Sequence, residues 1–215
     1  MQAVIFDMDG LLVDSEPLWR EAEVDVFGAI GVPLTQEMCR QTTGLRYDEV
    51  VRYWHARFPW EKPDREQVAQ TLLDAAQRLI VERGSLLEGA LDAITSLHAA
   101  GAKLAIASSS PLQLIQAVVK KFALDEYFLV LHSAADENAG KPDPAVYLTT
   151  MSLLGVEPNQ CLALEDSVSG LLAARAAGAT VIAVPDSESA HEPAFAEADI
   201  VLSSLAEFSI EHFLR

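Results

Sequence analysis

The chain has 215 residues, half of them hydrophobic, so it is long enough for one good-sized domain or for a domain that carries a smaller insertion. Its 32 acidic residues outnumber its 15 basic ones, and the formal net charge of −17 argues against nucleic acid or an anionic membrane as a partner. Two distant cysteines form no disulfide framework or metal cluster, and no uncharged apolar stretch reaches the ~18 residues of a membrane span, so we expect a soluble, cytoplasmic protein.

The first predicted elements are a buried strand and a long helical insertion. Residues 3–7 (AVIFD) are continuously apolar up to the acid, as expected of a strand buried on both faces of a sheet. From residue 15 to residue 85 the apolar residues recur at helical spacing between Gly and Pro breaks. Roughly 70 residues are too many for a simple crossover between two strands. We therefore predict a small helical domain over residues 15–85, able to act as a lid on a core formed by 1–14 and 86–215.

In the rest of the chain, strands and helices alternate. Apolar runs predict strands at 103–109, 127–134, 161–166, 180–184 and 199–204. Helical segments separate them at 92–100, 111–122, 144–155 and 168–178. This alternation is typical of an α/β domain whose parallel sheet is covered by helices on both faces.

Side chains with chemical function follow the predicted strands. They are four acids, three hydroxyls and one lysine: Asp7 and Asp9, Ser108, Ser109 and Ser110, Lys141, Glu165 and Asp166. Because ligands of open α/β sheets bind at the carboxyl ends of the strands, we expect these side chains to converge at one edge. An all-oxygen ligand set suits Mg²⁺ rather than zinc, and the lysine and serines suit a phosphate. We predict that Asp7 and Asp9 share a divalent cation and a phosphate.

Each of these features also has a purely structural interpretation. An isolated Asp-x-Asp-Gly is also typical of a strand that ends in a turn. A serine run before a helix often only caps that helix, and Lys141, between Gly140 and Pro142, equally fits an exposed loop. The occurrence of all the motifs in one chain favours the phosphate site.

Four motifs identify the family that the chain resembles. DMDGLLVDSE (7–16), LAIASSS (104–110), the lysine of GKPDP (140–144) and ALEDS (163–167) have the order and spacing of those in haloacid dehalogenase superfamily phosphatases. The resemblance spans the whole chain. It implies a Rossmann-like core and puts the helical insertion where that family has its cap. DSEPLW, TGLR, ASSSP and LEDSVSG are most similar to the β-phosphoglucomutase branch, and within it to 2-deoxyglucose-6-phosphate and hexitol phosphatases.

The resemblance implies a role for each matching residue. Asp7 resembles the nucleophile that takes the phosphoryl group, and Asp9 resembles the general acid that later activates water as a base. The implied metal ligands are Asp7, the Asp9 backbone carbonyl and Asp166, with Glu165 at or next to the metal. The implied phosphate ligands are Ser108, the backbone of Ser109, and Lys141. The implied activity is Mg²⁺-dependent hydrolysis of small sugar or sugar alcohol phosphates through an aspartyl-phosphate, and we expect a monomer.

Cap residues are assigned on weaker grounds. Arg46 in TTGLR resembles an arginine that reaches the substrate from the cap, although a solvent-exposed arginine at a helix start fits the same pattern. Glu16, Trp19 and Arg20 lie beside the first linker, where they would face a bound sugar. Trp19 equally fits packing within the cap.

Other activities of the same family fit this sequence less well. Sugar-phosphate mutases, the main alternative, carry a cap histidine where this chain has Trp19. Phosphonate hydrolysis wants a cap lysine as Schiff-base donor, and the cap has only Lys62, in a turn-like segment. The dehalogenases lack the second acid of the pair, which is present here as Asp9. The intact acids and Lys141 argue against a catalytically inactive regulatory homologue.

Overall fold

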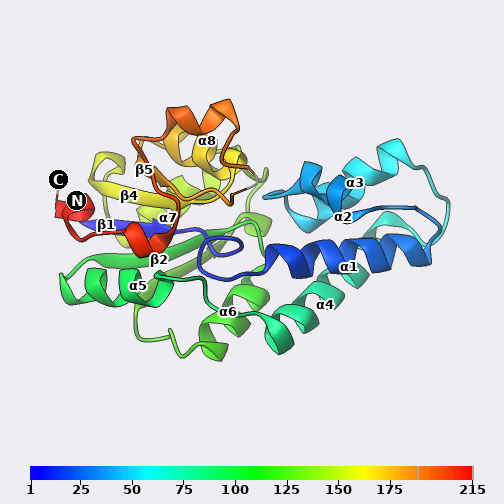
Figure 1. The fold of residues 1–215 in the computed structure, drawn as a ribbon, viewed down its shortest axis with the longest axis horizontal. Coiled ribbons are helices and arrows are strands. Elements are labelled where there is room, and N and C mark those ends of the chain that lie inside the picture. The colour runs from blue at the N-terminus through cyan, green and yellow to red at the C-terminus, as the bar shows by residue number, and fades with distance from the viewer. Residues whose placement is uncertain (188, 215) are drawn as a thin grey trace.

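The structure is a computed structural model that describes residues 1–187 and 189–214, and it has two lobes (Figure 1). Within the described residues, the larger lobe contains one six-stranded parallel sheet in the order β3-β2-β1-β4-β5-β6. Its strands are β1 (Ala3–Phe6), β2 (Lys103–Ser108), β3 (Phe128–Ser133), β4 (Cys161–Glu165), β5 (Thr180–Ala183) and β6 (Ile200–Val201). The predicted α/β class is confirmed, and the strand order reverses at β1, which places a topological switch point at its carboxyl end.

Helices cover both faces of the sheet because alternate residues of each strand point to opposite sides. Val4 and Phe6 pack in one apolar cluster with helices α5 (Ala90–Ala99) and α6 (Leu112–Lys121). Ala3 and Ile5 pack in a second cluster with α7 (Ala145–Leu154) and α8 (Val168–Ala176), on the other side of the sheet in Figure 1. The remaining short helices of this lobe are η2 (Ala134–Asp136), η3 (Pro158–Gln160), η4 (Pro193–Glu197), η5 (Leu205–Glu207) and α9 (Glu211–Leu214).

The two edge strands differ from the prediction. Continuous apolar runs at 127–134 and 199–204 predicted strands buried on both faces, but Leu129 of β3 is 69% exposed and Val201 of β6 is 49% exposed. An edge strand has a neighbour on one side only, so the layers of helices cover it incompletely. β6 accordingly pairs with β5 over only two residues.

The smaller lobe, called the cap from here on, is helical. It consists of α1 (Glu16–Ala29), α2 (Gln36–Cys39), η1 (Arg40–Thr42), α3 (Tyr47–Arg57) and α4 (Arg65–Arg83). Pro17 lies in the first turn of α1, where its missing N–H is not needed, and the Asp64 carboxylate caps α4 by accepting from the Gln67 N–H at 2.8 Å. Phe27 and Trp54 belong to a third apolar cluster, which lies within the cap.

The two linkers between the lobes run side by side. The Asp14 N–H donates to the Ser85 carbonyl at 2.9 Å, and the Leu87 N–H donates to the Leu12 carbonyl at 2.9 Å. This short antiparallel contact brings the entry and exit of the cap together next to the carboxyl end of β1.

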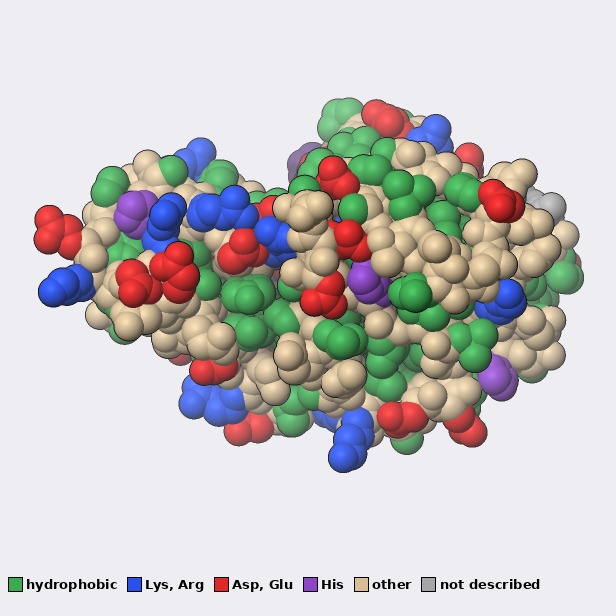
Figure 2. Space-filling view, turned by 180° about the vertical axis from the view of Figure 1, so that it is seen from behind, with side chains coloured by type: hydrophobic (Ala, Val, Ile, Leu, Met, Phe, Trp, Pro, Cys, Tyr) green, Lys and Arg blue, Asp and Glu red, His purple; other side chains and the backbone are tan. Residues whose placement is uncertain are grey.

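Figure 2 shows basic and acidic side chains next to one another over the cap and at its junction with the larger lobe. The cap has exposed ion pairs between Arg52 and Asp48, at 2.9 Å, and between Arg83 and Glu21, at 2.6 Å. Exposed pairs of this kind contribute about 1 kcal/mol or less each to stability. Within residues 1–187 and 189–214, no helix is long and apolar enough to cross a membrane.

Candidate active site

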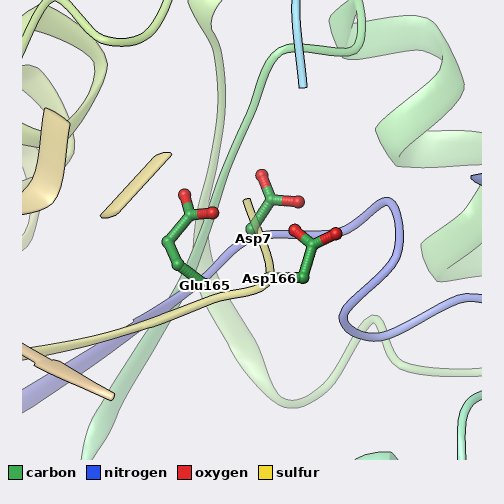
Figure 3. Close-up of side chains that lie close together, drawn as sticks. All are labelled: Asp7, Glu165 and Asp166. Atoms are coloured by element: carbon green, nitrogen blue, oxygen red, sulfur yellow. The ribbon is translucent and has the colours of Figure 1, made fainter. Parts of the chain in front are cut away.

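Three carboxyl groups meet at the carboxyl edge of the sheet. Asp7 directly follows β1, whereas Glu165 ends β4 and Asp166 follows it. The register aligns Phe6 with Leu164, so the next residues of both strands emerge at the same level. Figure 3 shows the three side chains close together there, and one oxygen of each lies within 4.8 Å of the other two.

Lys141 bridges two of these acids. Its Nζ lies 2.6 Å from Asp7 Oδ1 and 2.5 Å from Glu165 Oε1, and it also donates to the Ala107 carbonyl at 3.0 Å. The three donors of the ammonium group are thus satisfied, although only 1% of its side chain is exposed. The Tyr147 hydroxyl donates to the same Glu165 oxygen. These contacts make Glu165 the residue that holds Lys141 in place beside Asp7.

The cluster carries more negative charge than one lysine balances. Burial raises the pKa of Asp7 to about 8, helped by Glu165 and Asp9 and opposed by Lys141. Burial and the neighbouring Asp7 and Glu165 also raise the pKa of Asp166 well above its ordinary value. Burial opposes the charge of Lys141, but the two acids outweigh it and raise the pKa of Lys141. A divalent cation is the ligand that relieves such an excess.

The residues present fit Mg²⁺. The cluster offers carboxylate oxygens, which Mg²⁺ prefers, and the three oxygens are close enough to reach one ion. Gly10 has a φ of +76°, and a Cβ added there would lie 2.2 Å from Asp166 Oδ2. A glycine is therefore needed for the loop to pass Asp166. Asp7, Glu165 and Asp166 are the described residues whose carboxylates would reach one ion, and the Asp9 carbonyl stays a predicted ligand.

Asp9 is held by side chains from both lobes. Its Oδ1 accepts from the Ser15 hydroxyl at 2.7 Å and from the Trp19 indole N–H at 3.0 Å, both at the start of the cap. Its Oδ2 accepts from the Ser110 hydroxyl at 2.7 Å and from the Ser108 hydroxyl at 3.4 Å. The position of the cap therefore decides which groups surround Asp9. Trp19 was expected either to face a bound sugar or to pack within the cap. It lines the cavity and also packs against the apolar cluster of the cap.

The serines after β2 have separate partners. Ser108 accepts from the Ser110 N–H at 3.0 Å, which fixes its hydroxyl beside Asp9. The Ser109 hydroxyl donates to the Gly44 carbonyl of the cap at 2.9 Å. In this structure Ser109 thus contributes to the contact between the lobes.

One cavity under the cap contains most of the predicted site residues. Among the described residues, its lining includes Asp7, Asp9, Ser108, Ser109, Lys141 and Asp166. Glu165 is fully buried behind Lys141.

Arg46 lies outside that lining. Its Nη1 donates to the Ala134 and Glu137 carbonyls at 3.1 Å each, and its Nε donates to Asp48 at 3.1 Å. Arg46 is 9% exposed, so it is not the solvent-exposed arginine that the pattern also allowed. Its contact with a substrate stays a prediction.

Several residues that build the site were not identified from the sequence. Tyr147 follows Lys141 by six positions on the next helix, and a buried tyrosine needs a polar partner. Glu23 lies in the cap lining of the cavity. The sequence does carry a signal that Glu23 faces inward. Glu23 lies between the apolar residues Ala22 and Val26 and is seven residues from Glu16, which puts the two acids on one helix face.

Comparison with known proteins agrees with this geometry. Residues 1–178 match the family model described as haloacid dehalogenase-like hydrolase. The chain is 43% identical to hexitol phosphatase B of Escherichia coli over 213 residues, which cover 99% of this chain and 96% of that protein. It is 32% identical to a probable pseudouridine-5'-phosphatase of Drosophila melanogaster, covering 97% and 92% of the two chains. The crystal structure of CbbY from Rhodobacter sphaeroides in complex with phosphate superposes with a TM-score of 0.87 at 30% identity, covering 96% of each chain. The chain therefore belongs to the haloacid dehalogenase-like hydrolases.

Proposed function

We propose that this protein is a Mg²⁺-dependent phosphoric monoester hydrolase that acts on small sugar or sugar alcohol phosphates. The observation that carries the proposal is the buried Asp7–Lys141 pair, 2.6 Å apart, beside Asp166 and under a helical cap. The similarity to a protein named hexitol phosphatase B supports the substrate class.

In the first step, an Asp7 oxygen attacks the phosphorus of the substrate. The bond between this oxygen and phosphorus forms, and the bond from phosphorus to the leaving oxygen breaks. Asp9 gives its proton to that oxygen, so the product leaves as a neutral alcohol. Lys141 balances the charge of the phosphoryl group on Asp7, and Ser108 donates to its oxygens; the 2.6 Å contact of Lys141 with Asp7 and the place of Ser108 in the cavity lining support these roles.

In the second step, Asp9 acts as a base. It takes a proton from water, and the water oxygen attacks the phosphorus of the aspartyl-phosphate. Inorganic phosphate leaves, Asp7 regains its carboxylate, and Asp9 regains its proton. Bound Mg²⁺ would neutralise negative charge on the phosphoryl oxygens. The contacts from Ser15 and Trp19 orient Asp9 for both steps while the cap is closed.

The cap is proposed to move as one unit. Residues 15–85 form helices with their own apolar cluster and are connected to the larger lobe by two adjacent linkers. Closure over the site would exclude bulk water from the aspartyl-phosphate, and opening would release the alcohol. We further propose a cytoplasmic monomer whose partner is a small phosphorylated sugar or sugar alcohol.

The aspartyl-phosphate distinguishes the two aspartates experimentally. With acetyl phosphate, whose leaving group needs little protonation, Asp9→Asn should still phosphorylate Asp7 but should lose the base for water. Rapid quench with labelled acetyl phosphate should therefore trap phosphate on the protein. Turnover of sugar phosphates should fall by on the order of 10²–10⁴ in the same variant.

Asp7→Asn is the matched control, because an amide oxygen at the same place cannot carry the phosphoryl group. It should trap no phosphate and be inactive on every substrate. Normal sugar phosphate turnover by Asp9→Asn, without trapped phosphate, would contradict the mechanism.

A further inference from the structure

The cap side of the active-site cavity carries two acids. Glu16 and Glu23 are seven residues apart on α1, so they lie on the same face of the helix, and both line the cavity that contains Asp7 and Lys141. Neither residue takes part in the chemistry proposed above. They line the cavity from the cap, whereas Ser108, Ser109 and Lys141 line it from the larger lobe.

Glu23 is held firmly in place. It is 5% exposed, and its Oε2 accepts from the Thr42 hydroxyl at 3.2 Å and from the Trp54 indole N–H at 3.1 Å. The Cys39 thiol is a third donor to the same carboxyl group. A carboxylate has roughly four lone-pair sites, so one acceptor site remains for a group in the cavity.

Glu16 has more unused hydrogen-bonding capacity. Its nearest charged partner is Arg20, at 3.6 Å, and its carboxyl accepts no hydrogen bond from any residue within 1–187 and 189–214. Its side chain is 17% exposed. A mostly buried acid without a hydrogen bond, lining a cavity, is poised to accept from hydroxyl groups of a ligand.

The cap offers no positive charge to this cavity. Among the described residues, none of those that line it from the cap is Lys or Arg. Arg20 lines an adjoining cleft and is compensated by Glu16. Arg46 donates to the Ala134 and Glu137 carbonyls of the larger lobe. A second phosphate or a carboxylate on the substrate would therefore meet two acids in a cavity beneath the cap, where like charges repel more strongly than in bulk water.

We propose that Glu16 and Glu23 select substrates whose leaving group is a neutral polyol and reject those that carry a second anionic group. This rests on the proposed phosphatase function and narrows its substrate class. The free acceptor sites of the two carboxyls bind hydroxyl groups, while their charge excludes sugar bisphosphates and phosphorylated sugar acids.

A matched pair of substrates tests the proposal. Glucitol 6-phosphate and 6-phosphogluconate have the same carbon chain and differ at its far end, where one has a hydroxymethyl group and the other a carboxylate. The quantity measured is the ratio of their kcat/KM values at pH 8. For the wild-type protein this ratio should be on the order of 100 or more in favour of glucitol 6-phosphate.

Isosteric variants identify the residues responsible. Glu23→Gln keeps an oxygen for Thr42 and Trp54 but removes the charge, and it should lower the ratio roughly tenfold. Glu16→Gln should act in the same direction; within the described residues it removes no hydrogen bond and only the 3.6 Å ion pair with Arg20. Asp25→Asn removes an equal charge from an exposed position of α1 and should leave the ratio unchanged.

The outcomes separate this proposal from the phosphatase function. Equal turnover of the two substrates, or an unchanged ratio in both glutamine variants, would overturn the selection by Glu16 and Glu23 while leaving a phosphatase. If the protein, supplied with Mg²⁺, hydrolyses neither of these substrates and no p-nitrophenyl phosphate, the phosphatase function itself is overturned.

Discussion

The buried carboxylate of Glu23 should lower the unfolding free energy of the protein at neutral and alkaline pH. Burial raises the pKa of Glu23 from 4.5 to about 7, although hydrogen bonds from Trp54, Cys39 and Thr42 and the charge of Arg20 act in the opposite direction. The folded protein therefore binds this proton more tightly than the unfolded chain. The stabilisation that the protonated Glu23 carboxyl provides is fully present below pH 4.5 and is lost as the pH rises through about 7.

The magnitude follows from the shift. Each pKa unit corresponds to about 1.4 kcal/mol, so the wild-type protein should lose about 3 kcal/mol of unfolding free energy from this group between pH 4.5 and pH 8. Glu23→Gln has no charge to bury and should not show this loss. For a chain of this size, about 3 kcal/mol corresponds to a difference of roughly 6–12 °C in Tm.

The assay is thermal unfolding in EDTA, followed by circular dichroism from pH 4.5 to pH 8. The variant should gain Tm over the wild type as the pH rises. The neighbouring titratable groups are Glu16, whose pKa burial raises to about 7, and the Cys39 thiol, whose pKa burial raises to about 12; both are present in each protein. Asp25→Asn should follow the wild type. A pH-independent difference between Glu23→Gln and the wild type would refute the reasoning.

Three further predictions concern catalysis and the cap. EDTA should abolish phosphatase activity, Mg²⁺ should restore it, and calcium should inhibit because it tolerates a larger and looser coordination shell; full activity in excess chelator would contradict the metal site. Arg46→Ala should lower kcat/KM for sugar phosphates and for p-nitrophenyl phosphate by similar factors, since its bonds to Ala134 and Glu137 join the lobes; a loss of about 2 kcal/mol confined to sugar phosphates would instead show that Arg46 contacts the sugar. Trp19→Phe removes one donor to Asp9 and should lower kcat several-fold while leaving Asp7 phosphorylation by acetyl phosphate detectable, and an unchanged kcat would show that this contact is not used.

The sheet was predictable because burial leaves a local pattern. The segments 3–6 and 161–164 are apolar at every position, which only a strand covered on both faces requires, and each is followed directly by an acid at the same edge. The edge strands were less predictable, since the apolar run at 199–204 does not reveal that β6 has a neighbour on one side only.

The contacts of the cap were not predictable from local patterns. The hydrogen bonds of Ser15 and Trp19 to Asp9 depend on how two lobes are oriented, and helical periodicity carries no information on that orientation. Arg46 shows the same limit, because two of its partners are backbone carbonyls some 90 residues away in the chain, at Ala134 and Glu137. A glutamate on a helix is usually exposed, so the place of Glu23 between Ala22 and Val26 was only a weak signal of its burial.

The adjacent linkers make the cap an exchangeable module. Because the chain leaves the larger lobe at Leu12–Asp14 and returns at Ser85–Leu87, hydrogen-bonded to where it left, another insert with closely spaced ends would join without stretching the sheet. A graft that began after Trp19 would keep the donors to Asp9, whereas one that began at Ser15 would bring in new ones. The choice of junction would thus decide whether a transplanted cap changes only which alcohol is accepted or also the rate of proton transfer.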